Sequence, residues 1–239
     1  MTIPVIALDL GGRSVNVTVR RSASARRLSL RLDPAVGPLL VLPAKTRLAE
    51  AEAFLLAHRV WLAERLARLP QRIQLVAGAR LPLLGIDHEI RHAPEARRGV
   101  WAEAGVLHVS GRAEHVPRRV ADFIKAEAKR RIYGLAFELA ARLGRTPSRV
   151  TMRDTRSRWG SCSSRGDLSF SWRLALAPES VLTYVVAHEV AHLAEMNHSP
   201  AFWRLVEDLV GDPGAAKRWL KANGARLHCY EVGAGAGAE

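Results

Sequence analysis

Hydrophobic and polar residues alternate along much of the first part of the chain, as they do in strands with one buried face. Three short stretches show this alternation or a continuous hydrophobic run: residues 15–19, 28–32 and 39–42. Each of them predicts a strand. Between residues 46 and 69 the hydrophobic residues instead recur at helical spacing, with Thr46 as the expected N-cap and Pro70 just after the expected end.

The pattern returns to short strands over residues 79–110. Two hairpins are expected there, turning near Gly85 and Gly105, because glycine readily adopts the backbone conformations that tight turns need. Together with the preceding strands, this pattern predicts a mostly β N-terminal region with one long helix, spanning residues 1–115.

Helical spacing dominates the second half of the chain. An amphipathic helix is expected over residues 117–143, with Gly144 just past its end. Further elements are expected in this order: strands over 150–154 and 168–172, then helices over 178–196, 200–210 and 213–222, the last ending at Gly224. The chain is therefore expected to be an α+β protein, in which a helical domain with a small sheet (116–230) precedes a flexible tail (231–239).

The residues that indicate a chemical activity lie in the stretch 178–203, which contains the pattern H-E-x-x-H. His188 and His192 are four residues apart, so on a helix they lie one turn apart on one face and can bind a single Zn²⁺. Glu189 lies between them and can take a proton from metal-bound water. Hydrophobic residues occupy nearly every face of this helix, and buried imidazoles must be paired or metal-bound.

The helix that carries the motif is expected to begin at Pro178 and to end near Met196, with Asn197 in the left-handed conformation. The next helix is expected to have Ser199 as its N-cap, followed by a proline in the first helical position. The turn between the two helices therefore holds His198, whose imidazole can point back toward the metal.

Two residues compete for the place of third metal ligand. His198 follows His192 by six residues, which is the ligand spacing of the metzincin pattern, although the glycine of that pattern is replaced by Glu195. Glu195 follows His188 and His192 along one helical face, but its side chain would have to reach back over a turn. We favour His198 as the ligand, and Glu195 as a residue that hydrogen-bonds a ligand.

A second H-E-x-x-H occurs at residues 88–92, in a different context. Hydrophobic and polar residues alternate there between Gly85 and Pro94, which predicts a strand. Residues four apart in a strand are separated by roughly 13 Å, too far to share one metal ion. We therefore do not interpret His88 and His92 as metal ligands.

The composition is that of a globular protein with a large excess of positive charge. Of 239 residues, 48% are hydrophobic and 25% charged, and the formal net charge is +13. The 36 basic residues are dispersed, without the interleaved aromatic residues of a surface that stacks bases. Nucleic acid is therefore a possible partner that the sequence does not establish.

Membrane association and a disulfide framework are not expected. The chain contains no run of about 18 apolar residues, and its start lacks a basic segment followed by an apolar core, so a cytoplasmic location is expected. Cys162 and Cys229 are too few for a disulfide scaffold and are expected to be reduced thiols. The oligomeric state is not predicted.

An arginine-rich loop precedes the expected metal helix. Arg153, Arg156 and Arg158 lie in this non-periodic segment beside Asp154 and Trp159. A guanidinium group there could bind a substrate carboxylate or phosphate, or stabilise the oxyanion that develops during hydrolysis. The alternative is structural: Asp154 pairs with one arginine while Trp159 fills the core.

Several of these segments resemble a known family. RDTRSRWGSCSS, LSFSWRLALAP, VLTYVVAHEVAHLAEMNHSPAFW and WLKANG are similar to the YgjP-like metal-dependent hydrolases, a zincin family related to the SprT-like proteins. The likeness is densest from Arg153 to Tyr230. It implies a zincin-like C-terminal half, with zinc bound by His188, His192 and His198 and with Glu189 as catalytic base.

The residues and the resemblance together predict a zinc-dependent hydrolase with one Zn²⁺, favouring a metallopeptidase that acts on peptides or proteins. We keep three alternatives: a hydrolase of nucleotides or other phosphorylated substrates, a protease associated with nucleic acid, and a basic binding module with a structural zinc. The presence of Glu189 disfavours the last. We further hypothesise that the strand over residues 168–172 pairs with an extended peptide substrate.

Overall fold

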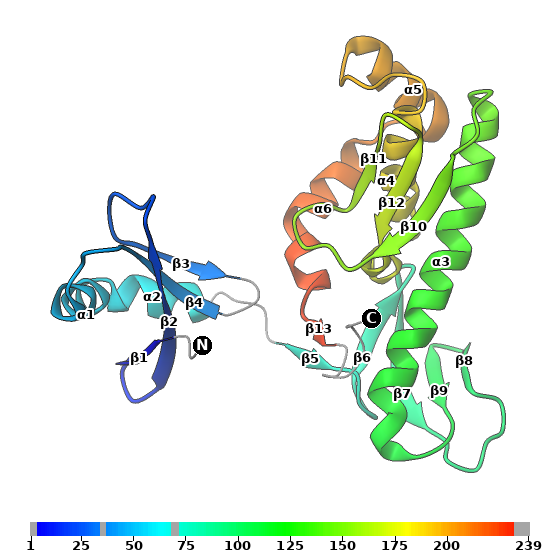
Figure 1. Ribbon diagram of the computed structural model, residues 1–239. Coiled ribbons are helices and arrows are strands. Elements are labelled where there is room, and N and C mark those ends of the chain that lie inside the picture. Colours follow the sequence, from blue (N-terminus) through cyan, green and yellow to red (C-terminus); the bar gives the residue numbers. More distant parts are fainter. Residues whose placement is uncertain (1–3, 34–36, 68–71, 232–239) are drawn as a thin grey trace. The chain divides into compact units, whose positions relative to one another are not determined.

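The computed structural model describes residues 4–33, 37–67 and 72–231, and within these ranges it confirms the predicted mixed α+β class (Figure 1). The chain divides into two compact units, Met1–Pro70 and Gln71–Glu239. The expected domain boundary between residues 115 and 116 falls inside the second unit. Of the expected flexible tail, only Glu231 is described, and it belongs to a strand. No helix in the described ranges is long and apolar enough to cross a membrane.

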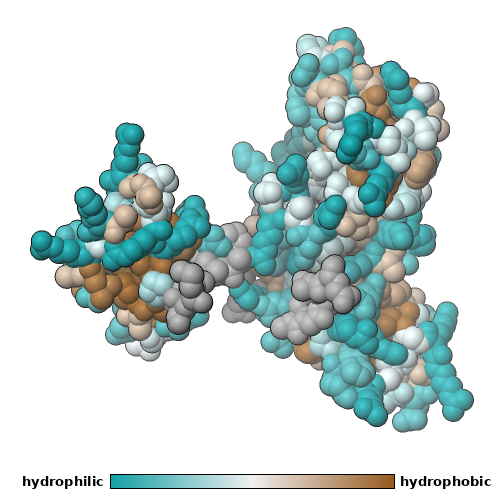
Figure 2. Space-filling view, in the orientation of Figure 1, coloured by the Kyte–Doolittle hydropathy of each residue, from teal (hydrophilic) through white to brown (hydrophobic). Residues whose placement is uncertain are grey.

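The first unit is a sheet packed against two helices. Its elements are β1 Val5–Asp9, β2 Ser14–Ser22, β3 Ser29–Asp33, β4 Gly37–Pro43, α1 Leu48–Ala57 and α2 Arg59–Ala67. The strand order is β1-β2-β4-β3, with the central pair β2 and β4 parallel. Val17, Leu40 and Leu55 are fully buried in its core. On the visible face of this unit, hydrophilic side chains border a hydrophobic patch (Figure 2).

The single helix expected over residues 46–69 is interrupted at His58. The His58 imidazole Nδ1 lies 2.8 Å from the Phe54 carbonyl oxygen, a side-chain contact to the same carbonyl that accepts the His58 backbone N–H. The expected N-cap was also wrong, because Arg47 occupies that position without a side-chain hydrogen bond. The expected stop at Pro70 lies outside the described residues.

The second unit contains a four-stranded sheet of order β6-β7-β9-β8. Its strands are β6 Arg80–Leu83, β7 Ile86–His92, β8 Val100–Glu103 and β9 Val106–Val109. Both expected hairpin turns are confirmed. Leu84 and Gly85 have φ angles of 51° and 87°, and Ala104 and Gly105 have 50° and 75°, so each turn has two residues with positive φ, as in type I′ turns.

One long helix, α3 (Val116–Arg142), forms the centre of this unit's core. A 3₁₀ turn, η1 (Ala113–His115), leads into it, and Gly144 lies just past its end with a φ of 63°, as expected. Its buried face, which includes Ile124 and Ile132, packs against the 3₁₀ segment η2 (Trp172–Leu176) and against α4 (Glu179–Ala191). The long helix thereby supports the helix that carries the H-E-x-x-H motif (Figure 1).

A three-stranded sheet lies beside α4 and corrects one hypothesis. It consists of β10 Arg149–Arg153, β12 Asp167–Ser171 and β11 Gly160–Cys162, in the order β10-β12-β11. β12 is hydrogen-bonded to β10 on one side and to β11 on the other, so it cannot pair with a peptide. The strand at the edge of the sheet on the α4 side is β11.

Two helices and a short strand pair complete the unit: α5 Pro200–Val210, α6 Gly214–Leu227, and the parallel strands β5 Ile73–Gln74 and β13 Tyr230–Glu231. α6 does not end at Gly224 as expected. A Cβ atom at Gly224 would lie 3.2 Å from Cζ2 of Trp159, so the glycine allows the indole ring to pack against the helix. The glycine at this position serves packing and does not terminate the helix.

The buried Arg173 ties several of these segments together. Its guanidinium donates to both carboxylate oxygens of Asp154, at 2.6 and 3.2 Å, and to the carbonyl oxygens of Leu227 and Tyr230, each at 3.0 Å. One guanidinium group therefore hydrogen-bonds to three segments: the arginine-rich loop, the end of α6 and the start of β13.

Replacing Arg173 by methionine should lower the free energy of unfolding by roughly 2–4 kcal/mol, because it leaves a carboxylate and two carbonyls without their donor. Urea unfolding of the full chain measures this change. The control is Arg118→Met, which breaks an exposed 3.5 Å ion pair with Asp122 and should change stability by less than about 0.5 kcal/mol. Equal effects of the two substitutions would contradict the role of Arg173.

Candidate metal centre

The metal helix α4 is shorter than expected. Pro178 is its N-cap, Glu179 in its first turn pairs with Arg131 of α3, and its last helical residue is Ala191. Asn197 does not adopt a positive φ. After Ala191 the backbone tightens into i→i+3 hydrogen bonds, from the Leu193 and Ala194 amides, so the helix ends earlier.

His192 is the C-cap of α4, and a backbone hydrogen bond orients its ring. The His192 Nδ1 lies 3.0 Å from the carbonyl oxygen of Glu195, so the ring donates through Nδ1 and leaves Nε2 available as a ligand atom. Glu195 therefore contacts this ring through its backbone. The sequence predicted that Glu195 hydrogen-bonds a ligand, without indicating which of its groups does so.

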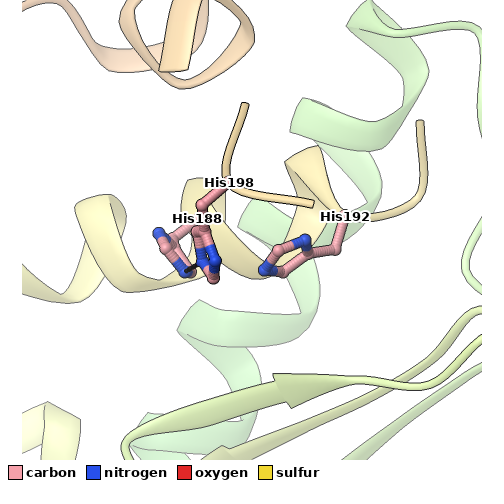
Figure 3. Close-up of side chains that lie close together, drawn as sticks. All are labelled: His188, His192 and His198. Atoms are coloured by element: carbon pink, nitrogen blue, oxygen red, sulfur yellow. Dashed lines mark hydrogen bonds between the residues drawn. The ribbon is translucent and has the colours of Figure 1, made fainter. Parts of the chain in front are cut away.

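The three histidines of the expected site converge (Figure 3). His188 lies on α4, and His198 lies in the turn before α5, where Ser199 caps the helix as expected by accepting from the Phe202 amide. The Nε2 atoms of His188 and His198 are 3.0 Å apart, and one ligand atom from each of the three histidines lies within 4.8 Å of the others. His188, His192 and His198 can therefore hold one metal ion.

The electrostatic environment favours neutral imidazoles, which is the metal-binding form. Burial, together with the charges of the two neighbouring imidazoles and of Lys217, lowers the pKa of His188 to about 4. Burial also lowers the pKa of His192, against the opposing effect of its hydrogen bond to the Glu195 carbonyl. The His188 Nδ1 is buried, and no residue in the described part of the chain hydrogen-bonds it.

Glu189 is buried against the edge strand β11. Only 7% of the residue is exposed, and a Cβ atom built on Gly160 would lie 2.5 Å from the Glu189 Cγ atom. Position 160 therefore has no room for a side chain beside this carboxyl group. Burial raises the pKa of Glu189 to about 7, while the positive charge of Arg158 acts in the opposite direction.

Four side chains around the histidines were not identified from the sequence. Phe202 of α5 is fully buried, and its ring centroid lies 4.5–4.9 Å from all three imidazole centroids. Trp203 stacks on His198 at 5.8 Å, and Lys217 of α6 lies 3.5 Å from the centroid of Trp203. Tyr184, one turn before His188, meets that ring edge-on at 6.0 Å. The signal that could have identified the first two is the adjacent pair of aromatic residues a few positions after His198.

The three loop arginines have different surroundings. Arg153 and Arg158 line one open pocket on the sheet, and Arg158 is the one whose charge acts on Glu189. Arg156 is exposed, and its charge contributes to lowering the pKa of His228, after burial and the charge of Arg173.

The structural alternative for the loop is partly confirmed. Asp154 does pair with an arginine, but its partner is Arg173, which lies outside the loop. Trp159 packs against the hydrophobic core and stacks on His228, with their ring centroids 4.9 Å apart. These two residues therefore hold the loop in place and leave the arginines exposed.

The earlier H-E-x-x-H lies in strand β7, as expected. His88 Nδ1 is 2.8 Å from the Ile86 carbonyl oxygen, and His92 Nε2 is 2.6 Å from that of Gly111. Each ring is thus satisfied by the backbone near it. Within the described ranges, the only group of histidine, cysteine or acidic side chains that meets the geometry of a metal site is the one on α4 and the following turn.

The mixed α+β fold and the three converging imidazoles define this chain as a candidate metal-binding protein. Comparison with known families identifies the family to which it belongs. A family model described as YgjP-like, metallopeptidase domain, matches residues 26–223. Because this match covers most of the chain, the protein belongs to the YgjP-like family. The resemblance identified in the sequence is confirmed.

One solved structure is similar to part of the chain. The crystal structure of the metallopeptidase zymogen of Pyrococcus abyssi abylysin matches with a TM-score of 0.35 and 24% sequence identity, over 40% of this chain and 94% of that chain. No curated protein sequence matches the chain.

With Glu189 as the expected catalytic base, replacing Gly160 by alanine should reduce peptide cleavage about 100-fold or more, because the new Cβ displaces the Glu189 carboxyl by an ångström or so. Metal content and folding should be unchanged. The matched control is Gly134→Ala in α3, where a Cβ meets no heavy atom within 4 Å and only helix propensity changes. Activity of Gly160→Ala within a few-fold of the original protein would show that this close approach is unimportant.

Proposed function

We propose that this protein is a zinc-dependent metallopeptidase in which His188, His192 and His198 hold a single Zn²⁺. The observation that carries the proposal is the convergence of three imidazoles, with one ligand atom of each within 4.8 Å of the others, beside the buried Glu189, which directly follows His188. Imidazole ligands suit zinc, and a set of three protein ligands is typical of catalytic sites, which keep one position open.

Glu189 is the proposed general base. When bound, Zn²⁺ supplies a Lewis acid for the scissile carbonyl and lowers the pKa of a coordinated water to about 7. Glu189 accepts a proton from the attacking water and then delivers it to the leaving amine. Gly160 fixes this carboxyl against β11, so its position is set before the substrate arrives.

We place the substrate along the free edge of β11. The Ser171 amide donates to the Trp159 carbonyl and the Ser163 amide donates to the Asp167 carbonyl. In an antiparallel ladder the intervening residues Gly160 and Cys162 then direct their backbone N–H and C=O groups away from β12. These groups are free to bind an extended peptide next to Glu189.

Hydrolysis of a phosphorylated substrate is the second candidate, and the position of Arg153 and Arg158 in one open pocket supports it. The peptidase is favoured because the chain belongs to a metallopeptidase-domain family and because no strand among the described residues pairs with the outer edge of β11. A cytoplasmic location and a boundary between residues 115 and 116 remain predictions.

Replacing Glu189 by glutamine should lower peptide hydrolysis by about 100- to 10,000-fold, because the amide cannot accept the proton. Zinc stoichiometry should stay the same. The measurement is turnover of a peptide library and of nucleoside triphosphates by the original protein and the variant. Equal turnover by both proteins on every substrate would reject an enzymatic role for this site, and loss confined to the triphosphates would favour the second candidate.

The choice between His198 and Glu195 as third ligand can be tested by metal affinity. His198→Ala should weaken zinc binding by more than about 100-fold, whereas Glu195→Gln should change it only slightly, because the contact with His192 uses the backbone carbonyl. Competition with a chromogenic chelator measures both affinities. The opposite order of the two effects would show that the Glu195 carboxylate is the ligand.

A further inference from the structure

An open pocket of about 850 Å³ lies on the three-stranded sheet, on the face opposite to the buried Val150 and Phe170. Four arginines line it: Arg149, Arg153, Arg158 and Arg165. Ser161 and Ser169 add hydroxyl groups from neighbouring strands. Guanidinium and hydroxyl groups together offer many hydrogen-bond donors to an anion.

The positive charge of this arginine pocket is not neutralised from within. Asp167 is the only acidic residue that lines it, and it is bound by Arg165 at 3.5 Å and by the Ser163 hydroxyl at 3.1 Å. Within the residues that the structure describes, no carboxylate lies within 4.0 Å of the guanidinium groups of Arg149, Arg153 or Arg158. Three arginines therefore remain available for a ligand.

Arginines elsewhere in the same unit commonly have acidic partners. Arg72, Arg118 and Arg130 pair with Glu231, Asp122 and Glu127, at 2.7, 3.5 and 2.7 Å. Grouping like charges in one concavity without such partners raises its positive potential and favours an anionic ligand. The pocket thus differs from the general basic surface of this chain.

The arginine pocket also lies next to the proposed substrate strand. Successive residues of β11 face opposite sides of the sheet: Gly160 faces Glu189, and Ser161 lines the pocket. A peptide paired with β11 has the same alternation, so every second side chain, about 7 Å apart, lies on the face of the sheet that carries the pocket, with Arg158 as the arginine next to β11. The remaining side chains face α4.

We propose that the arginine pocket is a specificity subsite that binds aspartate or glutamate side chains of the peptide substrate, at alternate positions near the scissile bond. The inference rests on the proposed peptidase function, since β11 must bind the peptide. Nucleic acid fits less well, because no aromatic residue lines the pocket to stack a base.

The test uses the full-length, zinc-loaded protein and two fluorogenic peptides that differ only in having glutamate or glutamine at alternate positions on both sides of the cleaved bond. The kcat/KM should be at least about tenfold higher for the acidic peptide, because charge-assisted hydrogen bonds form only with the carboxylates. The ratio should fall toward one in Arg153→Gln/Arg158→Gln, which removes the pocket arginine next to β11 together with one on β10, and as salt is raised. It should be retained in the control Arg118→Gln, which lies on α3.

Binding separates failure of this subsite from failure of the peptidase function. Labelled acidic and neutral peptides are titrated with the Glu189→Gln protein, and with the same protein carrying the two arginine substitutions in addition. Tighter binding of the acidic peptide that is lost when the arginines are replaced supports the subsite. This outcome supports it even if the original protein cleaves neither peptide. Equal binding of the two peptides overturns the subsite, whether or not both are cleaved. An oligonucleotide that binds the pocket more tightly than the acidic peptide, and loses affinity in the arginine variants, overturns it in favour of nucleic acid.

Discussion

The convergence of three imidazole rings in one small space is the constraint that the surrounding elements of the second unit have to satisfy. His188 and His198 direct their Nε2 atoms at each other across 3.0 Å, and both rings rest on the buried Phe202. At most one of two neutral imidazoles can donate in such a contact, whereas both can direct lone pairs at a shared cation. Under the proposed function, the metal ion satisfies nitrogen atoms that would otherwise face one another.

This constraint explains why α4 is supported from several directions. The long helix α3 packs along it, α5 brings Phe202 beneath the rings, and β11 closes over Glu189 with a glycine. Arg173 holds the loop that leads into β11 by pairing with Asp154. The residues that position the site therefore come from segments spread over most of the second unit.

The sequence predicted the elements with strong periodicity and the residues with specific chemistry. The long helix ending before Gly144, the two hairpins and the histidines of the later H-E-x-x-H were all identified from local patterns. The sequence could not predict which distant segments pair or pack with one another. It placed β12 at the edge of the sheet, although the short strand β11, with only Gly160–Cys162, occupies that edge. Gly224 was read as a helix stop because its packing against Trp159 depends on tertiary contact.

Binding of one zinc ion by three histidine nitrogens is tested most directly by X-ray absorption spectroscopy of the zinc-loaded protein. We expect nitrogen or oxygen scatterers alone at about 2.0–2.1 Å, with the outer-shell scattering of three imidazoles. A sulfur scatterer at about 2.3 Å would contradict it, since Cys162 or Cys229 would then be a ligand. Scattering from fewer than three imidazoles would contradict it equally.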